Sequence, residues 1–238
     1  HIIDEAIEKG VNVIAVFHPI IFSGLKSITG KNYVERAVLK AIENKIAIYA
    51  IHTAFDNDYY GVNFGICEAL QLENQRILMP KYQSLKRLDV YVPQTHIEQV
   101  RDALLEAGAG SIGFYDDCSF TVKGQGSFRP KEGSIPFLGN TNEREYVDEE
   151  IISVIVENHL LGNVIGAMLQ SHPYEEVAHQ IIPLDNAHHY MGLGRYGDLK
   201  EEMDEKDFLN MVKNTFNLQV IRHSEFNNKK IKRVGVLG

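Results

Sequence analysis

Two short runs of β-branched and apolar residues near the start of the chain constrain its fold more than any other feature. Residues 11–16 read VNVIAV and residues 46–51 read IAIYAI, and both runs suit strands that are buried on both faces. Apolar residues at helical spacing precede each run, over residues 2–7 and 33–43. Helix, strand, helix, strand is the order of a parallel α/β sheet with right-handed crossovers. A third helix is expected over residues 62–70.

The pattern changes over the middle of the chain. Two successive β-α-β units are expected there, which is the order of a ferredoxin-like domain. The expected strands cover residues 87–92, 119–123, 151–156 and 177–182, and the expected helices cover residues 95–108 and 160–170. Thr95 and Glu98 form a candidate capping box for the first of these helices. Residues 124–139 are rich in Gly, Pro and Ser and lack periodicity, so a long loop is expected.

The alternation of helix and strand patterns seen at the start of the chain returns near its end. The expected elements are a loop containing residues 188–197, a helix from Asp204 to Phe216, and strands over residues 218–222 and 232–237. One host domain with one insert explains this order. We therefore expect an α/β (α+β) fold with a host over residues 1–83 and 187–238, and a ferredoxin-like insert over residues 84–186.

Composition disfavours several classes of protein. With 24 Lys plus Arg against 32 Asp plus Glu, the formal net charge is -8, whereas nucleic-acid scaffolds cluster positive charge. No apolar run approaches the roughly 18 residues of a membrane helix. Cys67 and Cys118 match no zinc-ribbon spacing and fit a reducing compartment, so we expect a cytoplasmic protein. His1 falls inside an expected helix and Gly238 follows an expected strand, so we also expect a piece of a longer protein.

Polar residues that suit metal binding follow the two apolar runs. His18 comes after the first run, and His52 and Asp56 come after the second. Ligands bind outside the carboxyl ends of strands in open α/β sheets, so the three side chains are expected at one edge. Imidazole and carboxylate together suit Zn, Fe, Mn or Co. The alternative is structural: His52 bonds to a backbone carbonyl and Asp56 caps the helix that begins near Gly61.

Several long motifs carry a resemblance to one family. VNVIAVFHPIIFSGLKSI, IAIYAIHTAFD, GVNFGICEAL and, near the end, MGLGRYGDL with IKRVGVLG resemble the NIF-three-like dinuclear metal centre family, the GTP cyclohydrolase 1 type 2 homologues. GSFRPKEGSIPFLG and SHPYEEVAHQIIPL are similar to the PII- and CutA-like insert of many bacterial members. The resemblance covers essentially the whole chain in order.

The resemblance implies two divalent metals per subunit. His18 matches the second of the family's paired histidines, Asp56 matches its aspartate, and His52 matches a histidine close to the metals. Phe17 stands where the family has its first histidine and cannot ligate a metal. The family's C-terminal His and Glu would lie beyond Gly238. Since each metal needs about four donors, we expect this chain to bind at most one, weakly.

The resemblance implies metal-dependent hydrolysis of a nucleotide-like substrate, such as opening of the GTP purine ring. Because an imidazole can both accept and donate a proton, we expect His52 to act as a catalytic proton shuttle. The alternative is a non-catalytic metal-binding regulatory or interaction protein whose insert senses a ligand. A homohexamer with trimer-forming inserts is also implied. The substrate itself stays unknown, a membrane partner is not expected, and nucleic acid is disfavoured.

Three other groups of residues permit a functional and a structural interpretation. His172, with Glu175 and Glu176, suits a metal or an anion, but a turn set by Pro173 is favoured. Gly124, Gly126 and the pair Arg129-Pro130 suit an anion cradle, but a plain loop is favoured. The adjacent histidines His188 and His189 are expected in a solvated loop.

Overall fold

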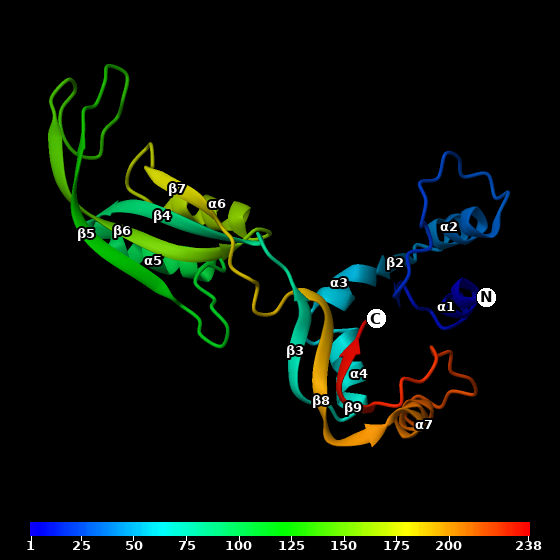
Figure 1. Ribbon diagram of the computed structural model, residues 1–238. Coiled ribbons are helices and arrows are strands. Elements are labelled where there is room, and N and C mark those ends of the chain that lie inside the picture. Colours follow the sequence, from blue (N-terminus) through cyan, green and yellow to red (C-terminus); the bar gives the residue numbers. More distant parts are fainter. The chain divides into compact units, whose positions relative to one another are not determined.

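The computed structural model describes every residue from His1 to Gly238. The chain divides into two compact units, the first made of His1–Met79 and Gly192–Gly238 and the second of Pro80–Met191. Figure 1 labels most of their helices and strands. Each unit has a hydrophobic core of its own, and the fold belongs to the mixed α/β class. None of the helices is both long enough and apolar enough to span a bilayer.

The first unit begins with a two-stranded parallel sheet that two helices cover on one face. Its elements are α1 (Ile2–Glu8), β1 (Val13–Val16), α2 (Tyr33–Glu43) and β2 (Ala47–Ala50). Val16 lies opposite Ala50 in the parallel register, so the two strands end side by side. Ile14 and Ile48 point from the strands into a small core with residues of both helices. The predicted helix, strand, helix, strand order is confirmed.

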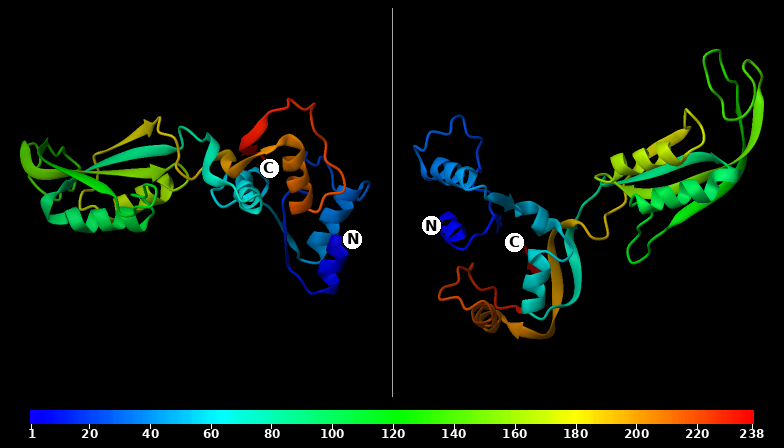
Figure 2. Two further views of the ribbon diagram at one scale, coloured as in Figure 1. Left: turned by 60° about the horizontal axis from the view of Figure 1, so that its bottom comes forward. Right: turned by 180° about the vertical axis from the view of Figure 1, so that it is seen from behind.

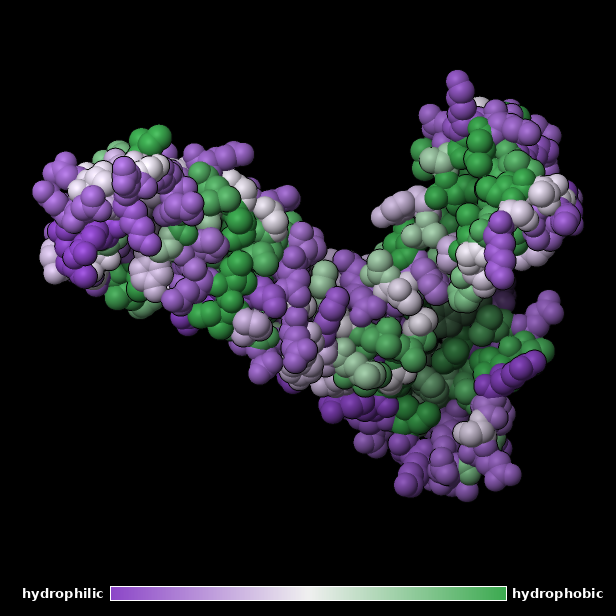
Figure 3. Space-filling view, turned by 90° about the horizontal axis from the view of Figure 1, so that it is seen from above, coloured by the Kyte–Doolittle hydropathy of each residue, from purple (hydrophilic) through white to green (hydrophobic).

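The other face of this sheet is exposed. Val13 is 54% exposed and Tyr49 is 63% exposed. The expectation of strands buried on both faces is therefore wrong here, because the helices cover only the face that carries Ile14 and Ile48. Figure 3 shows hydrophobic side chains gathered over this part of the first unit. The large exposed apolar residues of the segment include Ile2, Val13, Ile21, Phe22, Ile42 and Tyr49.

A three-stranded sheet with three helices completes the first unit. Its elements are α3 (His52–Asn57), α4 (Val62–Ala69), β3 (Glu73–Pro80), β8 (Gly192–Asp204), α7 (Glu205–Thr215) and β9 (Lys230–Val236). The strand order is β3-β8-β9, and β8 pairs with β9 in antiparallel fashion. Its core holds Cys67, Leu70, Leu72, Leu199 and Val236. Burial raises the pKa of the Cys67 thiol, as suits a structural cysteine.

Two elements of this sheet differ from the sequence expectation. Residues 192–204 form a long strand rather than part of a loop, and Gly197 is needed there because a Cβ atom would lie 2.8 Å from Leu72 Cβ. Residues 218–222 form no strand. Val220 is 79% exposed, so the apolar run finds neither a partner strand nor a core to pack against.

The second unit has the predicted β-α-β-β-α-β order. Its elements are β4 (Leu85–Pro93), the 3₁₀-helix η1 (Gln94–His96), α5 (Ile97–Glu106), β5 (Ser119–Phe128), β6 (Glu145–Glu157), α6 (Leu161–Ser171) and β7 (His179–Leu184). The strands form one antiparallel sheet in the order β5-β6-β4-β7, which is the ferredoxin-like arrangement. Figure 2 shows α5 and α6 on the same face of this sheet.

Two local expectations for the second unit are wrong. β5 runs on to Phe128, so Gly124 and Gly126 lie in a strand paired with β6 and not in the long loop. The capping box is absent as well. Thr95 Oγ1 lies 2.8 Å from His96 Nδ1, and α5 begins at Ile97 without a side-chain cap. The Thr95 hydroxyl thus pairs with the His96 ring and does not cap the helix.

The core of the second unit generates a stability prediction. Leu88 on β4 is fully buried between the sheet and the helices. Leu88→Ala should lower the free energy of unfolding by about 2–5 kcal/mol, through lost burial and a cavity. Urea denaturation followed by circular dichroism measures it. Leu169→Ala on α6 is the matched control, because Leu169 is 52% exposed, and an equal loss for both variants would contradict this core.

Candidate metal site

The end of the parallel strand pair positions the two candidate histidines. Val16 is the last residue of β1, and His18 follows it by two residues. β2 runs into α3 with only Ile51 between them, so His52 is the first residue of that helix. The His52 backbone N–H donates to the Phe17 carbonyl at 2.9 Å, and this bond holds the two chain segments together beyond the strands.

The rings of His18 and His52 lie side by side. Their centroids are 5.0 Å apart, and the Phe17 ring contacts both at 4.9 and 5.4 Å. Neither imidazole makes a hydrogen bond or an ion pair, so the structural alternative fails for the His52 side chain, whose ring bonds to no backbone carbonyl. His52 also has a φ of 24°, which few residues other than Gly adopt. Strain of this kind is concentrated at functional sites in proteins.

Asp56 lies one turn after His52 on α3, so the two side chains share a face of the helix. Asp56 is only 6% exposed, and its Oδ1 atom is buried without a hydrogen-bond partner. It does not cap α4, whose N-cap is Gly61 with no side-chain bond. A buried carboxylate oxygen without a partner is costly, which leaves a place for a cation or a donor.

Two further residues border Asp56. The Asn63 side chain donates to the Asp56 backbone carbonyl at 2.9 Å and accepts from the Gly238 N–H at 2.8 Å. A Cβ atom on Gly238 would lie 3.3 Å from Asp56 Oδ1. β9 therefore brings the last residues of this chain to the carboxylate.

The residues present do not assemble a closed metal site. No three or more His, Cys, Asp or Glu side chains come together as a possible metal-binding group anywhere in the chain. His18 and His52 are neighbours, and Asp56 shares a helix face with His52. The Phe17 ring packs against both imidazoles and brings no donor atom.

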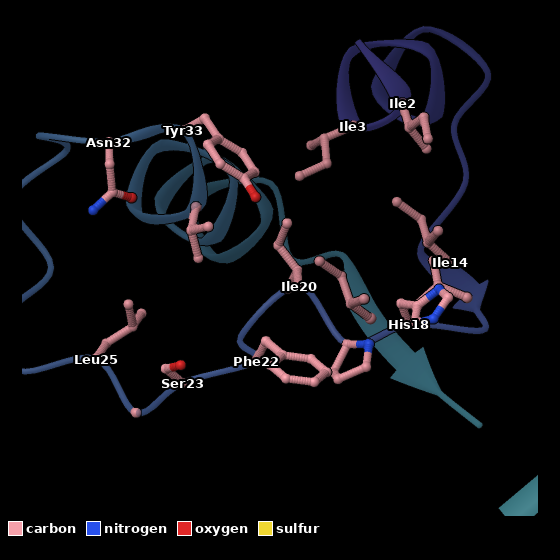
Figure 4. A pocket seen from close by; sticks show the side chains of 15 residues that line it. Ile2, Ile3, Ile14, His18, Ile20, Phe22, Ser23, Leu25, Asn32 and Tyr33 are labelled. Atoms are coloured by element: carbon pink, nitrogen blue, oxygen red, sulfur yellow. The ribbon is translucent and has the colours of Figure 1, made fainter. Parts of the chain in front are cut away.

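A cavity of about 580 Å³ lies beside His18. Figure 4 shows His18 on the opposite side of this cavity from Asn32, with Ile3, Ile20 and Phe22 among the residues around it. The lining is mainly apolar and contains no charged side chain, and its polar groups come from His18, Ser23, Asn32 and Tyr33. His52 and Asp56 do not line it.

The loop between β1 and α2 is held by a residue that the sequence reasoning missed. Glu35 is 6% exposed, and its Oε2 accepts hydrogen bonds from the Thr29 N–H and hydroxyl and from the Lys31 N–H, at 2.8, 3.0 and 3.1 Å. Asn32, the N-cap of α2, exchanges hydrogen bonds with Glu35. Asn-x-x-Glu at a helix start is the signal that was available. Through this loop Glu35 shapes the wall of the cavity beside His18.

Arg195 is a second residue without a sequence prediction. It is 3% exposed, stacks on the Tyr59 ring at 4.1 Å, and donates to the Tyr59 carbonyl at 2.6 Å and to Gln75 at 3.1 Å. No carboxylate neutralises it. Arg195 lies in the motif MGLGRYGDL and fixes the segment between α3 and α4, so it positions the helix that carries Asp56.

The chain has relatives among known proteins. The family model described as Duf34/NIF3 (NGG1p interacting factor 3) matches residues 1–238. The chain belongs to this family. Two curated proteins, each named GTP cyclohydrolase 1 type 2 homolog, come from Halalkalibacterium halodurans and Bacillus subtilis. Both are 43% identical to it over 238 residues.

The likeness to the NIF3 family extends to solved structures. The structure of a Bacillus cereus protein related to NIF3 is 42% identical, has a TM-score of 0.83, and matches 100% of this chain and 63% of that chain. The chain also covers 64% of the length of the two curated relatives, just under two thirds. The resemblance drawn from the sequence motifs is therefore confirmed at the level of the family.

The Glu35 network gives a prediction with a defined pH dependence. Hydrogen bonds from Thr29, and further from Lys31, hold the pKa of the Glu35 carboxyl below its usual range. A depressed pKa in the folded state means that the ionised carboxylate stabilises the fold above its unfolded pKa, and that this contribution is lost as the pH falls through the folded value. Glu35→Gln should therefore destabilise the chain at neutral pH, and the difference from the parent should shrink in acid.

Urea denaturation at neutral and at acidic pH measures this difference. Glu43→Gln is the matched control, since Glu43 lies exposed at the other end of α2. A difference between parent and Glu35→Gln that stays constant with pH would contradict the role of the carboxylate.

Proposed function

We propose that this chain supplies part of a divalent metal site, with His18 and Asp56 as ligands. The observation that carries the proposal is the buried Oδ1 atom of Asp56, which has no partner in the chain. The imidazoles of His18 and His52 are likewise without hydrogen bonds, and nitrogen with oxygen donors suits Zn, Fe, Mn or Co. Because Phe17 brings no donor, we propose at most one ion in this chain and two in each subunit of the intact protein.

We further propose that the whole protein is a metal-dependent hydrolase of a nucleotide-like substrate. A divalent ion would supply positive charge that polarises the bond to be broken. The His52 imidazole makes no hydrogen bond and lies next to His18, so it is placed to act as a proton shuttle there. The cavity beside His18 has no Lys or Arg in its lining, so it suits a base rather than phosphates. Turnover of GTP or of a simple phosphoester by the metal-supplemented whole protein tests this, and no turnover of either removes it.

We also propose that the second unit is a PII/CutA-like insert, over residues 84–186, and that it trimerises within a homohexamer. Its ferredoxin-like strand order supports this. The second candidate function is a non-catalytic regulatory protein whose insert senses a ligand. It is favoured by a cavity that is lined only by residues of this unit. Sedimentation of the whole protein as a monomer would contradict the hexamer.

The metal proposal predicts which side chains control affinity. Asp56→Asn and His18→Ala should each weaken the binding of Zn²⁺ or Mn²⁺ to the chain at least about tenfold, because each removes a side chain that binds the ion directly. Isothermal titration calorimetry measures the affinity. Asp102→Asn, an exposed position on α5, makes the same chemical change away from the site and should leave binding as it is.

A gain-of-ligand variant completes this test. Phe17→His places a third imidazole next to His18 and His52, so it should tighten metal binding or raise the number of ions bound. Elemental analysis after dialysis counts the ions. Equal affinity in the parent and in Asp56→Asn would refute the site, whatever Phe17→His does.

A further inference from the structure

A second cavity, of about 260 Å³, lies within the second unit and brings together two motifs that are distant in sequence. One wall comes from the end of β5 and the loop after it, the segment GSFRPKEGSIPF. The other comes from the turn between α6 and β7, the segment HPYEEVA. Glu175 Oε1 accepts the Ile135 N–H at 3.0 Å and so joins the two walls.

A buried carboxylate lies in this cavity. Glu149 on β6 lines it and is 9% exposed. Its Oε1 accepts a hydrogen bond from the Tyr174 hydroxyl at 3.0 Å, and its Oε2 receives none from the chain. Burial, and then the bond to Glu149, raise the pKa of Tyr174, so the phenol keeps its proton and acts as the donor.

Gly126 on the neighbouring strand makes room for this carboxylate. A Cβ atom at position 126 would overlap Glu149 Oε2, so the side chain lies across a strand that has no side chain of its own there. The glycine that suggested an anion cradle in the sequence therefore accommodates an acid.

His172 fixes the opposite wall and adds no charge. It is 7% exposed, its Nδ1 accepts the Tyr174 N–H at 3.1 Å, and its Nε2 donates to the Tyr91 carbonyl at 2.9 Å. Burial lowers the pKa of His172, which keeps the ring neutral. The turn interpretation of this histidine agrees with these bonds, and a ligand role does not, because both ring nitrogens are occupied.

Charge and wall chemistry decide the class of ligand. Three carboxylates line the cavity, those of Glu149, Glu175 and Glu176, against the single guanidinium of Arg129. Aromatic rings form part of the wall, with Phe137 6.2 Å and Phe128 5.8 Å from the Tyr174 ring. A negative, aromatic lining favours a cation with an apolar body, and it disfavours an anion.

We propose that this cavity binds a small organic ammonium compound, with its N–H groups donating to Glu149 and its carbon atoms against Phe137 and Tyr174. The cavity volume leaves room for a compound with a single ring. The site is separate from the one at His18, since all of its residues belong to the second unit. The cavity thus gives the ferredoxin-like unit a binding site for a positively charged ligand.

Three compounds with one ring and different charges test the proposal: benzylamine, benzyl alcohol and benzoate. Titration of each into the 238-residue chain is followed by NMR, through the signals of Tyr174 and Phe137. Benzylamine should bind at least about tenfold more tightly than the alcohol, because a charge-assisted bond to a buried carboxylate is the stronger one. Benzoate should bind most weakly.

Matched variants locate the binding. Glu149→Gln keeps the shape of the side chain and the acceptor for the Tyr174 hydroxyl but removes the negative charge. It should weaken the binding of benzylamine at least about tenfold. Glu150→Gln is the control, since the adjacent side chain points to the other face of β6 and lies 3.8 Å from Lys123. Gly126→Ala, checked for folding by circular dichroism, should also lose binding. Unchanged affinity in Glu149→Gln, tighter binding of benzoate, or no shift with any compound would each overturn the proposal.

Discussion

The first unit depends on the hydrogen bonds that join the ends of β1 and β2. Ile51 N–H donates to the Val16 carbonyl and His52 N–H to the Phe17 carbonyl, so the parallel pairing continues past the strands. No turn separates β2 from α3, and His52 absorbs the change of direction with a positive φ. Its side chain is therefore placed by backbone bonds, and the His18 side chain lies beside it for the same reason. A mutation that altered either ring would leave this frame intact.

The cost of burying Asp56 explains much of what surrounds it. A buried carboxylate without a partner destabilises a fold by several kcal/mol unless a positive charge or donors compensate it. Asn63 is close, but its amide donates to the Asp56 backbone carbonyl and its oxygen accepts from Gly238, so neither reaches Oδ1. Arg195 is buried in the same unit and is bound to Tyr59 and Gln75 instead. The unit thus holds the Asp56 carboxylate in place and leaves its Oδ1 atom without a partner.

Sequence patterns predicted the helices and strands that pack against elements close to them in sequence. They missed those whose packing partners are distant in sequence. β1, α2 and β2 could be predicted from the apolar runs around Ile14 and Ile48 and from the periodicity of α2. Each of these strands packs against a helix next to it in sequence. β8 was missed because its glycines indicate a loop, although Gly197 is required by the close approach of Leu72. Residues 218–222 have strand composition, but no strand lies beside them to accept their hydrogen bonds. His18, His52 and Asp56 were found from strand ends. Glu35 had a local signal in its spacing from Asn32, whereas Arg195 acts through contacts that only the fold reveals.

The ferredoxin-like unit shows how strand lengths create a cavity. β6 pairs with β4 only from Glu149 onward, opposite Pro93, while its preceding residues pair with β5 alone. Glu149 is therefore the first residue of β6 with strands on both sides, at the point where the four-stranded sheet narrows to a hairpin. The turn with Tyr174 covers this step, because His172 ties it to the end of β4 through the Tyr91 carbonyl. A carboxylate at such a step is buried by the sheet on one side and faces the cavity on the other. That geometry, rather than the loop sequence, makes the unit able to hold a ligand.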